Sequence, residues 1–236
     1  MRKACLALLS ALAVTAAPAH ALANKKKAKA DEAATAAAAT PAYAGSNVYA
    51  PVDFDKTAQP ENVLLLDLSN GQRVAIRLMP EWAPEHVKRV KELASQGFYN
   101  NIIFHRVIEG FMAQSGDPTG TGTGGSSLPD LKAEFNPQPH LRGTVSMARA
   151  ASDDSANSQF FIVFYPRFAL DKKYTAFGRV IDNMAAVDAI QRGEPPENPT
   201  RILQASLASE NKPAPVAAPA AAPAITADDL NKPIAN

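Results

Sequence analysis

The chain has 236 residues, 46% of them hydrophobic, and its 24 Lys and Arg against 23 Asp and Glu give a formal net charge of +1. A chain of this length holds one large domain or two small ones. The charges also balance in the centre, because residues 62–208 contain 15 basic and 15 acidic side chains. The sequence therefore predicts no basic surface suited to nucleic acid.

The first 23 residues have the organisation of a secretory signal peptide. Arg2 and Lys3 precede a short apolar run, and the segment ends in Ala21-Leu22-Ala23, so that cleavage is expected after Ala23. The alternative, a membrane anchor, needs about 20 apolar residues, more than this run offers. Cys5 lies too early for a lipoprotein signal, and its removal leaves a mature chain without cysteine. We therefore expect a periplasmic or otherwise exported protein that folds without disulfides.

Two low-complexity segments flank the central region. Residues 24–60 are rich in Ala, Lys and Pro, and residues 209–236 are rich in Ala and Pro. Neither has the periodic apolar pattern of a core, so both are predicted to be disordered, the first as a linker and the second as a tail. The basic run NKKKAKA is interpreted as a solvated tail, with weak attraction to an anionic membrane as the alternative. The folded domain is predicted to be residues 61–208, with no later segment apolar enough to span a bilayer.

The central region is predicted to consist of many short strands and two helices. NVLLLDLS and RVAIRLM flank Asn70-Gly71, a dipeptide typical of tight hairpins. Apolar residues then recur at helical spacing in residues 80–97, which end on Gly97. This arrangement favours an all-β fold, a closed antiparallel barrel with helices over its open ends. The later strands are expected in IIFHRVI, FMAQ, LKAEF, GTVSMA, QFFIVF, YTAFGRV and RILQASL, and the second helix in NMAAVDAIQR.

The glycine-rich loop has the spacing of a dinucleotide fingerprint at Gly120, Gly122 and Gly125. Such a fingerprint needs a helix directly after it, so that amide groups and the helix dipole meet a pyrophosphate. Pro129 follows instead, without helical periodicity, and no Lys completes a P-loop. A tightly turned or flexible surface loop is the better interpretation.

Metal and nucleophile patterns are also incomplete. His86, His105 and His140 show no ligand spacing. There is no G-x-S-x-G elbow, and the mature chain has no cysteine to act as nucleophile. A dyad of Ser115 and His105 is conceivable, but no pattern specifies it. Neither a metal nor a cofactor is expected.

Arg106 is unusual because it lies among apolar residues in FHRVI. Strand alternation places Phe104, Arg106 and Ile108 on one face and His105 and Val107 on the other. Taken singly, each nearby apolar residue is typical of an ordinary core position. The downstream residues that supply aromatic, thioether and amide surface are Phe111, Met112, Gln114, Phe160 and Phe161.

Taken together, four segments resemble the cyclophilin-type peptidyl-prolyl isomerases. They are FHRVIEGFMAQSGDPTGTGTGG, GTVSMA, NSQFFIVF and LDKKYTAFGRV, in this order. The resemblance covers residues 62–207, and the core pattern F-H-R-[VI]-I-x-G-F-M-x-Q-x-G-D is highly specific. It implies a closed eight-stranded antiparallel β-barrel capped by two α-helices. It also implies an enzyme, without cofactor, that rotates X–Pro peptide bonds and so assists the folding of exported proteins.

The resemblance implies a site as well. It makes Arg106 the catalytic residue, a donor to the prolyl nitrogen as the bond twists. Gln114 is expected to hold the substrate backbone and to orient Arg106, and His105 to be a structural, hydrogen-bonding residue beside the site. The residues that it assigns to substrate binding are Phe111, Met112, Gln114, Ala148, Arg149, Gln159, Phe161, Leu170 and Tyr174.

Three positions depart from the family pattern. Ala169 stands where many members have Trp, which puts sensitivity to cyclosporin in doubt, Tyr174 stands in place of His, and Arg149 in place of Asn. The expected partners are proline-containing segments of unfolded or folded exported proteins, bound by a monomer that has no nucleic-acid partner and no integral membrane span. The alternative function is a binding module that holds such segments with little catalytic turnover.

Overall fold

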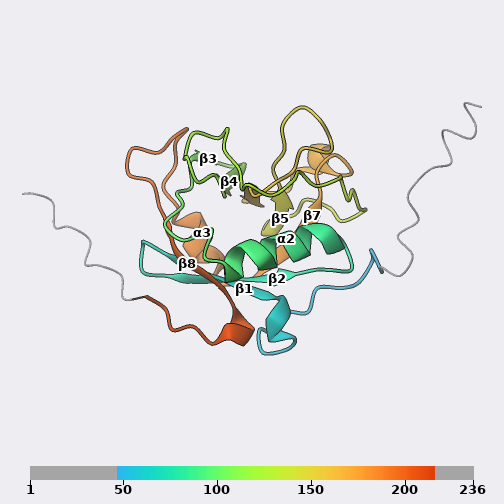
Figure 1. Ribbon diagram of the computed structural model, residues 1–236, viewed down its shortest axis with the longest axis horizontal. Coiled ribbons are helices and arrows are strands. Elements are labelled where there is room, and N and C mark those ends of the chain that lie inside the picture. The colour runs from blue at the N-terminus through green and yellow to red at the C-terminus, as the bar shows by residue number, and fades with distance from the viewer. Residues whose placement is uncertain (1–46, 216–236) are drawn as a thin grey trace, which may run out of the picture. The chain divides into compact units, whose positions relative to one another are not determined.

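A computed structural model of the protein describes residues 47–215. The predicted signal peptide, most of the predicted linker and the end of the predicted tail lie outside these residues. The described part is mainly β, a curled sheet of eight antiparallel strands with two α-helices (Figure 1). The strands are β1 (Val63–Leu68), β2 (Arg73–Leu78), β3 (Arg106–Ile108), β4 (Met112–Ser115), β5 (Thr144–Met147), β6 (Phe160–Val163), β7 (Ala176–Asp182) and β8 (Ile202–Leu207), and the helices are α2 (Pro84–Ser95) and α3 (Met184–Asp188).

The strand order is β3-β4-β6-β5-β7-β2-β1-β8, and every neighbouring pair is antiparallel. The eight strands and two helices implied by the family resemblance are confirmed, but the closed barrel is not. The end strands β3 and β8 are not paired as strands; isolated bridges join Ile103 to Arg201 and Val107 to Gly193. The sheet is an open half-barrel because β3 is only three residues long and faces a loop, which touches it at single points.

The predicted hairpin at Asn70-Gly71 is confirmed. β1 and β2 pair in register from Val63 opposite Arg77 to Asp67 opposite Arg73. Gly71 has a φ of 81°, a left-handed conformation that glycine adopts without steric cost. The turn therefore forms where the sequence pattern predicts it.

Helix α2 receives its N-terminal cap from a distant residue. Ala83 offers no side-chain cap, and the carboxylate of Glu134 accepts hydrogen bonds from the N–H groups of Glu85 at 3.1 Å and His86 at 3.0 Å. A carboxylate in this place satisfies free N–H groups and complements the helix dipole. The predicted strand LKAEF is therefore wrong. Its segment makes one isolated bridge, at Leu131. The backbone N–H groups of Ala133 and Glu134 donate to the side chains of Asp154 and Thr175 instead of to a neighbouring strand.

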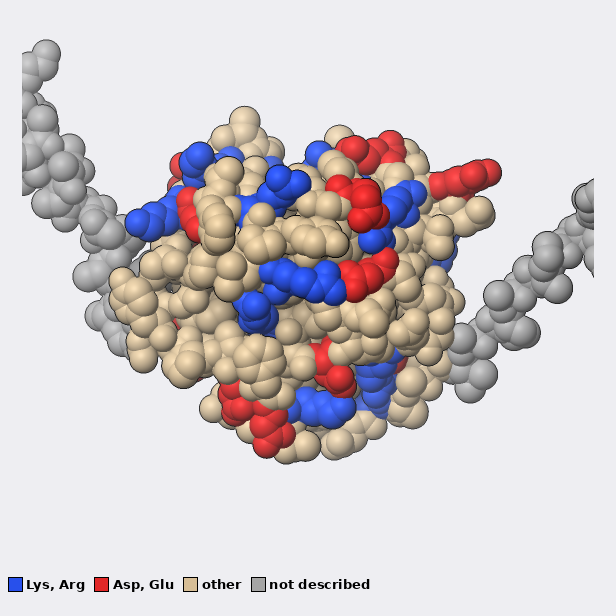
Figure 2. All heavy atoms as spheres, turned by 180° about the vertical axis from the view of Figure 1, so that it is seen from behind, with Lys and Arg blue, Asp and Glu red and all other residues tan. Residues whose placement is uncertain are grey.

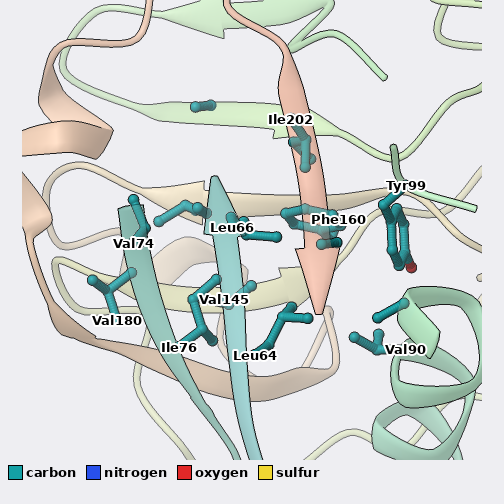
Figure 3. Close-up of a cluster of buried hydrophobic side chains, with 14 of the residues drawn as sticks. Leu64, Leu66, Val74, Ile76, Val90, Tyr99, Val145, Phe160, Val180 and Ile202 are labelled. Atoms are coloured by element: carbon teal, nitrogen blue, oxygen red, sulfur yellow. The ribbon is translucent and has the colours of Figure 1, made fainter. Parts of the chain in front are cut away.

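The main core contains side chains of the sheet and of the helices. Helix α2 packs against β8, and α3 packs against β2. Apolar side chains from all eight strands and from both helices meet in the core, and burying each large one stabilises the fold by about 1.5–3 kcal/mol. Figure 3 shows Leu64 and Leu66 of β1 close to Ile76 of β2, with Val90 of α2 near Tyr99.

The segment just before the predicted domain start at residue 61 is bound to the sheet. Arg77 of β2 is only 2% exposed, and its guanidinium donates hydrogen bonds to carbonyl oxygens of four residues between 53 and 59. The last part of the predicted linker is thus bound to the sheet. At the other end, the carbonyl oxygen of Pro213 accepts a hydrogen bond from Gln204 at 3.0 Å, so the start of the predicted tail is also bound.

The charged surface is mixed. On the face shown in Figure 2, basic and acidic side chains lie next to one another in small groups. Ion pairs among the described residues include Lys56 with Asp182 and Arg142 with Asp188. Separately, none of the helices within residues 47–215 has the length and apolar character needed to cross a membrane.

Arg77→Met tests the attachment of the N-terminal segment. The substitution keeps most of the apolar stem but leaves four carbonyl oxygens without their charged donor, so we expect a loss of about 2–4 kcal/mol in unfolding free energy. Limited proteolysis should cut between residues 47 and 59 faster than in the wild type. Lys88→Met, on the exposed face of α2, is the control. Equal cleavage rates in the two variants would contradict this account.

Candidate active site

The predicted site residues converge on three adjacent strands. Arg106 of β3 lies opposite Gln114 of β4, which lies opposite Phe161 of β6. Because directly opposed residues share a face of a sheet, these three side chains form a row on one face. A pocket of about 590 Å³ opens there, and it takes in every predicted site residue except Gln159. Its lining consists of His105, Arg106, Phe111, Met112, Gln114, Gly120, Thr121, Gly122, Ala148, Arg149, Phe161, Leu170, Tyr174, Glu194 and Pro195.

The floor of the pocket is a small apolar cluster, separate from the main core. Met112, Phe161 and Val163 are buried in it, and partly buried apolar side chains pack around them, Phe111 and Leu170 among these. An apolar surface left partly open in a concave site is typical of ligand-binding pockets. The cluster exists because β4 and β6 turn alternate side chains away from the main core.

A buried hydrogen-bonded chain supports this floor. The ring of His140 stacks on that of Phe161, with centroids 6.2 Å apart and an interplanar angle of 18°. Nδ1 of His140 lies 2.8 Å from Oδ1 of Asp171, and Nε2 lies 2.9 Å from Oγ of Ser146. Burial lowers the pKa of His140, although Asp171 acts in the opposite direction. Ser146 is itself buried. The hydrogen bonds that link Asp171, His140 and Ser146 therefore hold Phe161 in place and do not present a nucleophile.

Arg106 is half-exposed and oriented by a residue that the sequence analysis missed. Its Nε donates to Oε2 of Glu194 at 2.8 Å, and the two side chains are 42% and 52% exposed. The prediction that Gln114 orients Arg106 is wrong, because the Gln114 amide donates instead to Oε1 of Gln159 at 2.9 Å. Glu194 lies 88 positions along the chain, and no local pattern marks it.

The expected alternation in FHRVI holds only in part. Arg106 lines the pocket, Ile108 packs against the small cluster in the floor of the pocket, and Val107 lies in the main core, so these three alternate as predicted. Phe104 lies in the main core and His105 beside the pocket, the reverse of the prediction. The reason is that β3 begins only at Arg106, so strand alternation does not reach the two residues before it.

His105 does not form the expected hydrogen bonds. Within residues 47–215 neither ring nitrogen has a hydrogen-bond partner, and burial lowers the pKa of the ring. The conceivable dyad with Ser115 is absent, because the Ser115 hydroxyl donates to the carbonyl oxygen of Ile103 at 2.9 Å. His105 therefore contributes its ring surface to the wall of the pocket, where it lies against the loop that contains Gly122.

The glycine-rich loop is wrapped around its own carboxylate. Asp117 accepts hydrogen bonds from both the N–H and the hydroxyl of Thr119 and from the N–H groups of Gly122 and Gly124. Burial raises the pKa of Asp117, but these hydrogen bonds outweigh it and lower the pKa to about 2. These N–H groups of the loop are thus used internally, and of the two interpretations offered by the sequence the structure favours the tightly turned loop.

Gln159 joins this loop to the strands. Its amide donates to the carbonyl oxygens of Gly122 at 3.0 Å and Gly124 at 2.8 Å, while its oxygen accepts from Gln114. It borders an adjoining pocket of about 510 Å³ and not the one that contains Arg106. The sequence-based expectation that Gln159 stands near the site agrees with this placement.

Arg149 builds the wall opposite Arg106. Its guanidinium lies 4.9 Å from the ring centroid of Tyr174, donates to the carbonyl oxygen of Lys173 and pairs with Asp153 at 3.0 Å. A cation over an aromatic face stabilises both groups. Since its donors are already engaged, Arg149 shapes the pocket through Tyr174. The N–H of Ala148 is also engaged, with the carbonyl oxygen of Gln159 at 2.9 Å.

Residues 64–207 match the family described as "Cyclophilin type peptidyl-prolyl cis-trans isomerase/CLD". The chain belongs to this family. It is 44% identical over 177 residues to a "Probable peptidyl-prolyl cis-trans isomerase" of Brucella suis, covering 68% of this chain and 90% of that protein. It is 41% identical over 128 residues to "Peptidyl-prolyl cis-trans isomerase B" of Bacillus subtilis, covering 54% of this chain and 89% of that protein.

Solved cyclophilin structures have the same fold. A cyclophilin from Hirschia baltica, 28% identical, superposes with a TM-score of 0.60 over 65% of this chain and 76% of that one. A cyclophilin-type isomerase from Cryptosporidium parvum, determined in the presence of the dipeptide Ala-Pro, is 30% identical. Its TM-score is 0.57, over 61% of this chain and 98% of that one. The present chain is thus a cyclophilin-type peptidyl-prolyl cis-trans isomerase, in agreement with the resemblance found in its sequence.

Two of the three departures from the family pattern, Arg149 and Tyr174, line this cyclophilin's pocket. Tyr174 lines the pocket and contacts Phe161 edge to face, with centroids 5.6 Å apart. Ala169 is exposed and absent from the lining, and its neighbour Phe168 is also exposed. Within residues 47–215 no group of three or more His, Cys, Asp or Glu side chains is arranged to hold a metal ion.

The pH dependence of stability tests the neutral state of His140. Because burial lowers its pKa in the folded state, the unfolded chain binds the proton more readily, and stability should fall as the pH drops below about 6.5. Replacing the ring in His140→Gln should cost about 1–3 kcal/mol at pH 7.5 and should flatten the decline in melting temperature between pH 7.5 and 5.5. The same decline in both proteins would show that His140 does not contribute to it.

Proposed function

We propose that Arg106 and the apolar pocket beside it carry the isomerase activity. The supporting observation is the position of a guanidinium at the rim of a pocket floored by Met112 and Phe161. Rotation about an X–Pro bond is slow because amide resonance must be lost, with a barrier of about 20 kcal/mol and uncatalysed times of tens of seconds or more. No covalent bond is made or broken, so the site has only to favour the twisted amide.

Arg106 would favour the twisted amide by donating a hydrogen bond. As the bond rotates, the prolyl nitrogen becomes pyramidal and regains a lone pair. The guanidinium is always protonated and presents several donors on a planar frame. A charge-assisted hydrogen bond formed only at this stage contributes about 1.5–3 kcal/mol, or about one to two decades in rate.

The pocket would supply the remaining stabilisation. Phe111, Met112, Phe161 and Leu170 offer an apolar surface for the proline ring, and low polarity disfavours the charge-separated planar amide relative to the twisted one. Fixing the ring also lets the preceding segment rotate against a held group. We infer that Gln114 and the backbone of Ala148 and Arg149 hold the substrate main chain, with the carbonyl oxygen of Ala148 as one acceptor.

Arg106→Ala is expected to lower kcat/KM for an Ala-Pro peptide by about ten- to a hundredfold while the melting temperature stays unchanged. The rate is followed as cis-to-trans relaxation of the peptide, and peptide binding is measured separately. Arg201→Ala, which removes an exposed arginine outside the pocket, is the control. A wild type that binds the peptide without accelerating relaxation would favour the alternative of a proline-binding module. Joint loss of activity and folding in Arg106→Ala would make Arg106 structural.

We further propose that this cyclophilin works outside the cytoplasm and assists the folding of exported proteins as a monomer. The support is the signal-peptide pattern of residues 1–23, which ends in Ala-Leu-Ala. Proline-containing segments of newly exported chains are suitable substrates, because X–Pro isomerisation limits the folding rate of many proteins. No metal or cofactor takes part in the proposed reaction.

Blocking the signal-peptide cleavage site tests the localisation. Ala23→Asp puts a charged side chain where small residues are required, so the full-length precursor should accumulate. The wild-type chain should be found in the periplasmic fraction with Asn24 as its first residue, by Edman or mass analysis. Ala28→Asp, a few residues beyond the site, should be processed normally. A wild-type chain that keeps residues 1–23 and remains in the cytoplasm would contradict the proposal.

A further inference from the structure

Arg106 can act only if its long side chain is held in one place. A free arginine has several rotatable bonds, and ordering them on substrate binding would reduce the gain from any hydrogen bond formed. The half-exposed position of Arg106 offers little packing to restrain it. Some other contact must therefore set the direction of the guanidinium, and the row of side chains on β4 and β6 does not provide it.

Glu194 makes that contact. Its Oε2 accepts the hydrogen bond from Nε of Arg106 at 2.8 Å, and both side chains line the same pocket. Within residues 47–215 this is the one hydrogen bond that the guanidinium makes. The carboxylate therefore holds the inner nitrogen and leaves both terminal nitrogens of Arg106 available to a ligand.

The backbone that carries Glu194 is tied to the strand of Arg106. Gly193 and Val107 exchange two hydrogen bonds, of 2.8 and 2.9 Å, between their N–H and carbonyl groups. Gly193 has a φ of 143°, and a Cβ there would come within 2.5 Å of Cα of Pro196, so only glycine fits. Arg192, the residue before Gly193, pairs with Glu109 at 2.7 Å. The two residues that precede Glu194 are thus both bound to the segment that contains Arg106.

We propose that Glu194 is a positioning residue for catalysis: it fixes the guanidinium of Arg106 so that the terminal N–H groups face the prolyl nitrogen of a bound peptide. This inference rests on the catalytic role proposed for Arg106. Exposed ion pairs contribute little to folding stability, so the pair between Glu194 and Arg106 is placed to affect the reaction more than the fold.

The test compares Glu194→Ala and Glu194→Gln with Glu197→Gln, which removes an exposed carboxylate from the same loop outside the pocket. Glu194→Ala should lower kcat by about five- to tenfold and change KM by less than about twofold, with an unchanged melting temperature. Glu194→Gln keeps an oxygen that can accept from Nε and should recover part of the loss. Glu197→Gln should behave as the wild type. Wild-type kcat in Glu194→Ala would overturn the inference.

A second measurement separates positioning from a general effect on the loop. In ¹⁵N-labelled protein the Nε–H signal of Arg106 should be protected from exchange in the wild type and in Glu197→Gln, and should lose protection in Glu194→Ala. Glu194→Ala should also add no further loss in an Arg106→Ala background, because the two residues act as one unit. Equal losses in both backgrounds would overturn the inference. Full activity in Arg106→Ala alone would instead remove the catalytic role on which it rests.

Discussion

The register between β3, β4 and β6 is the constraint on which the site depends. It places Arg106, Gln114 and Phe161 in one row, and a slip of one residue would turn every side chain of a strand to the opposite face. The same pairing places Met112 in the neighbouring row, opposite Val163, where it forms part of the floor of the pocket. A charged donor beside an apolar surface is thus a product of strand pairing. The chemistry follows from this placement, because twisting an amide needs a fixed donor and a fitted ring surface.

Polar contacts, some local and some between distant parts of the chain, hold the walls of the pocket and one helix in place. Asp117 organises the loop on one side, and His140 supports Phe161 from behind. Glu134 fixes the start of α2, away from the pocket. In each case a buried or partly buried acceptor meets backbone or ring N–H groups, an arrangement that is costly to disrupt, since an unpaired buried group loses its hydration without replacement. The exposed pair between Arg106 and Glu194 differs from these buried contacts. Its proposed role is to set the direction of the Arg106 guanidinium, not to stabilise the fold.

Local pattern was sufficient where neighbours in sequence are neighbours in space. The hairpin at Asn70-Gly71 and the strands on either side of it follow from turn chemistry and alternation. The motif around Arg106 was specific enough to indicate the family, and the pocket contains the residues that it pointed to, with Gln159 just beside it. Prediction failed where alternation was extended beyond a short strand, as at Phe104, and where a segment with strand composition, residues 131–135, was bound by a helix end.

The sequence by itself determined that this chain carries the cyclophilin motif, which residues would gather around Arg106, and that most of the sheet would be antiparallel. Only the tertiary structure decided that the half-barrel stays open, that residues 53–59 are bound to the sheet through Arg77, and that Glu194 accepts a hydrogen bond from Arg106. The physical reason is the distance along the chain over which each kind of interaction acts. Turn and strand preferences act between residues a few positions apart, whereas contacts such as that of Glu194 exist only after the chain has folded.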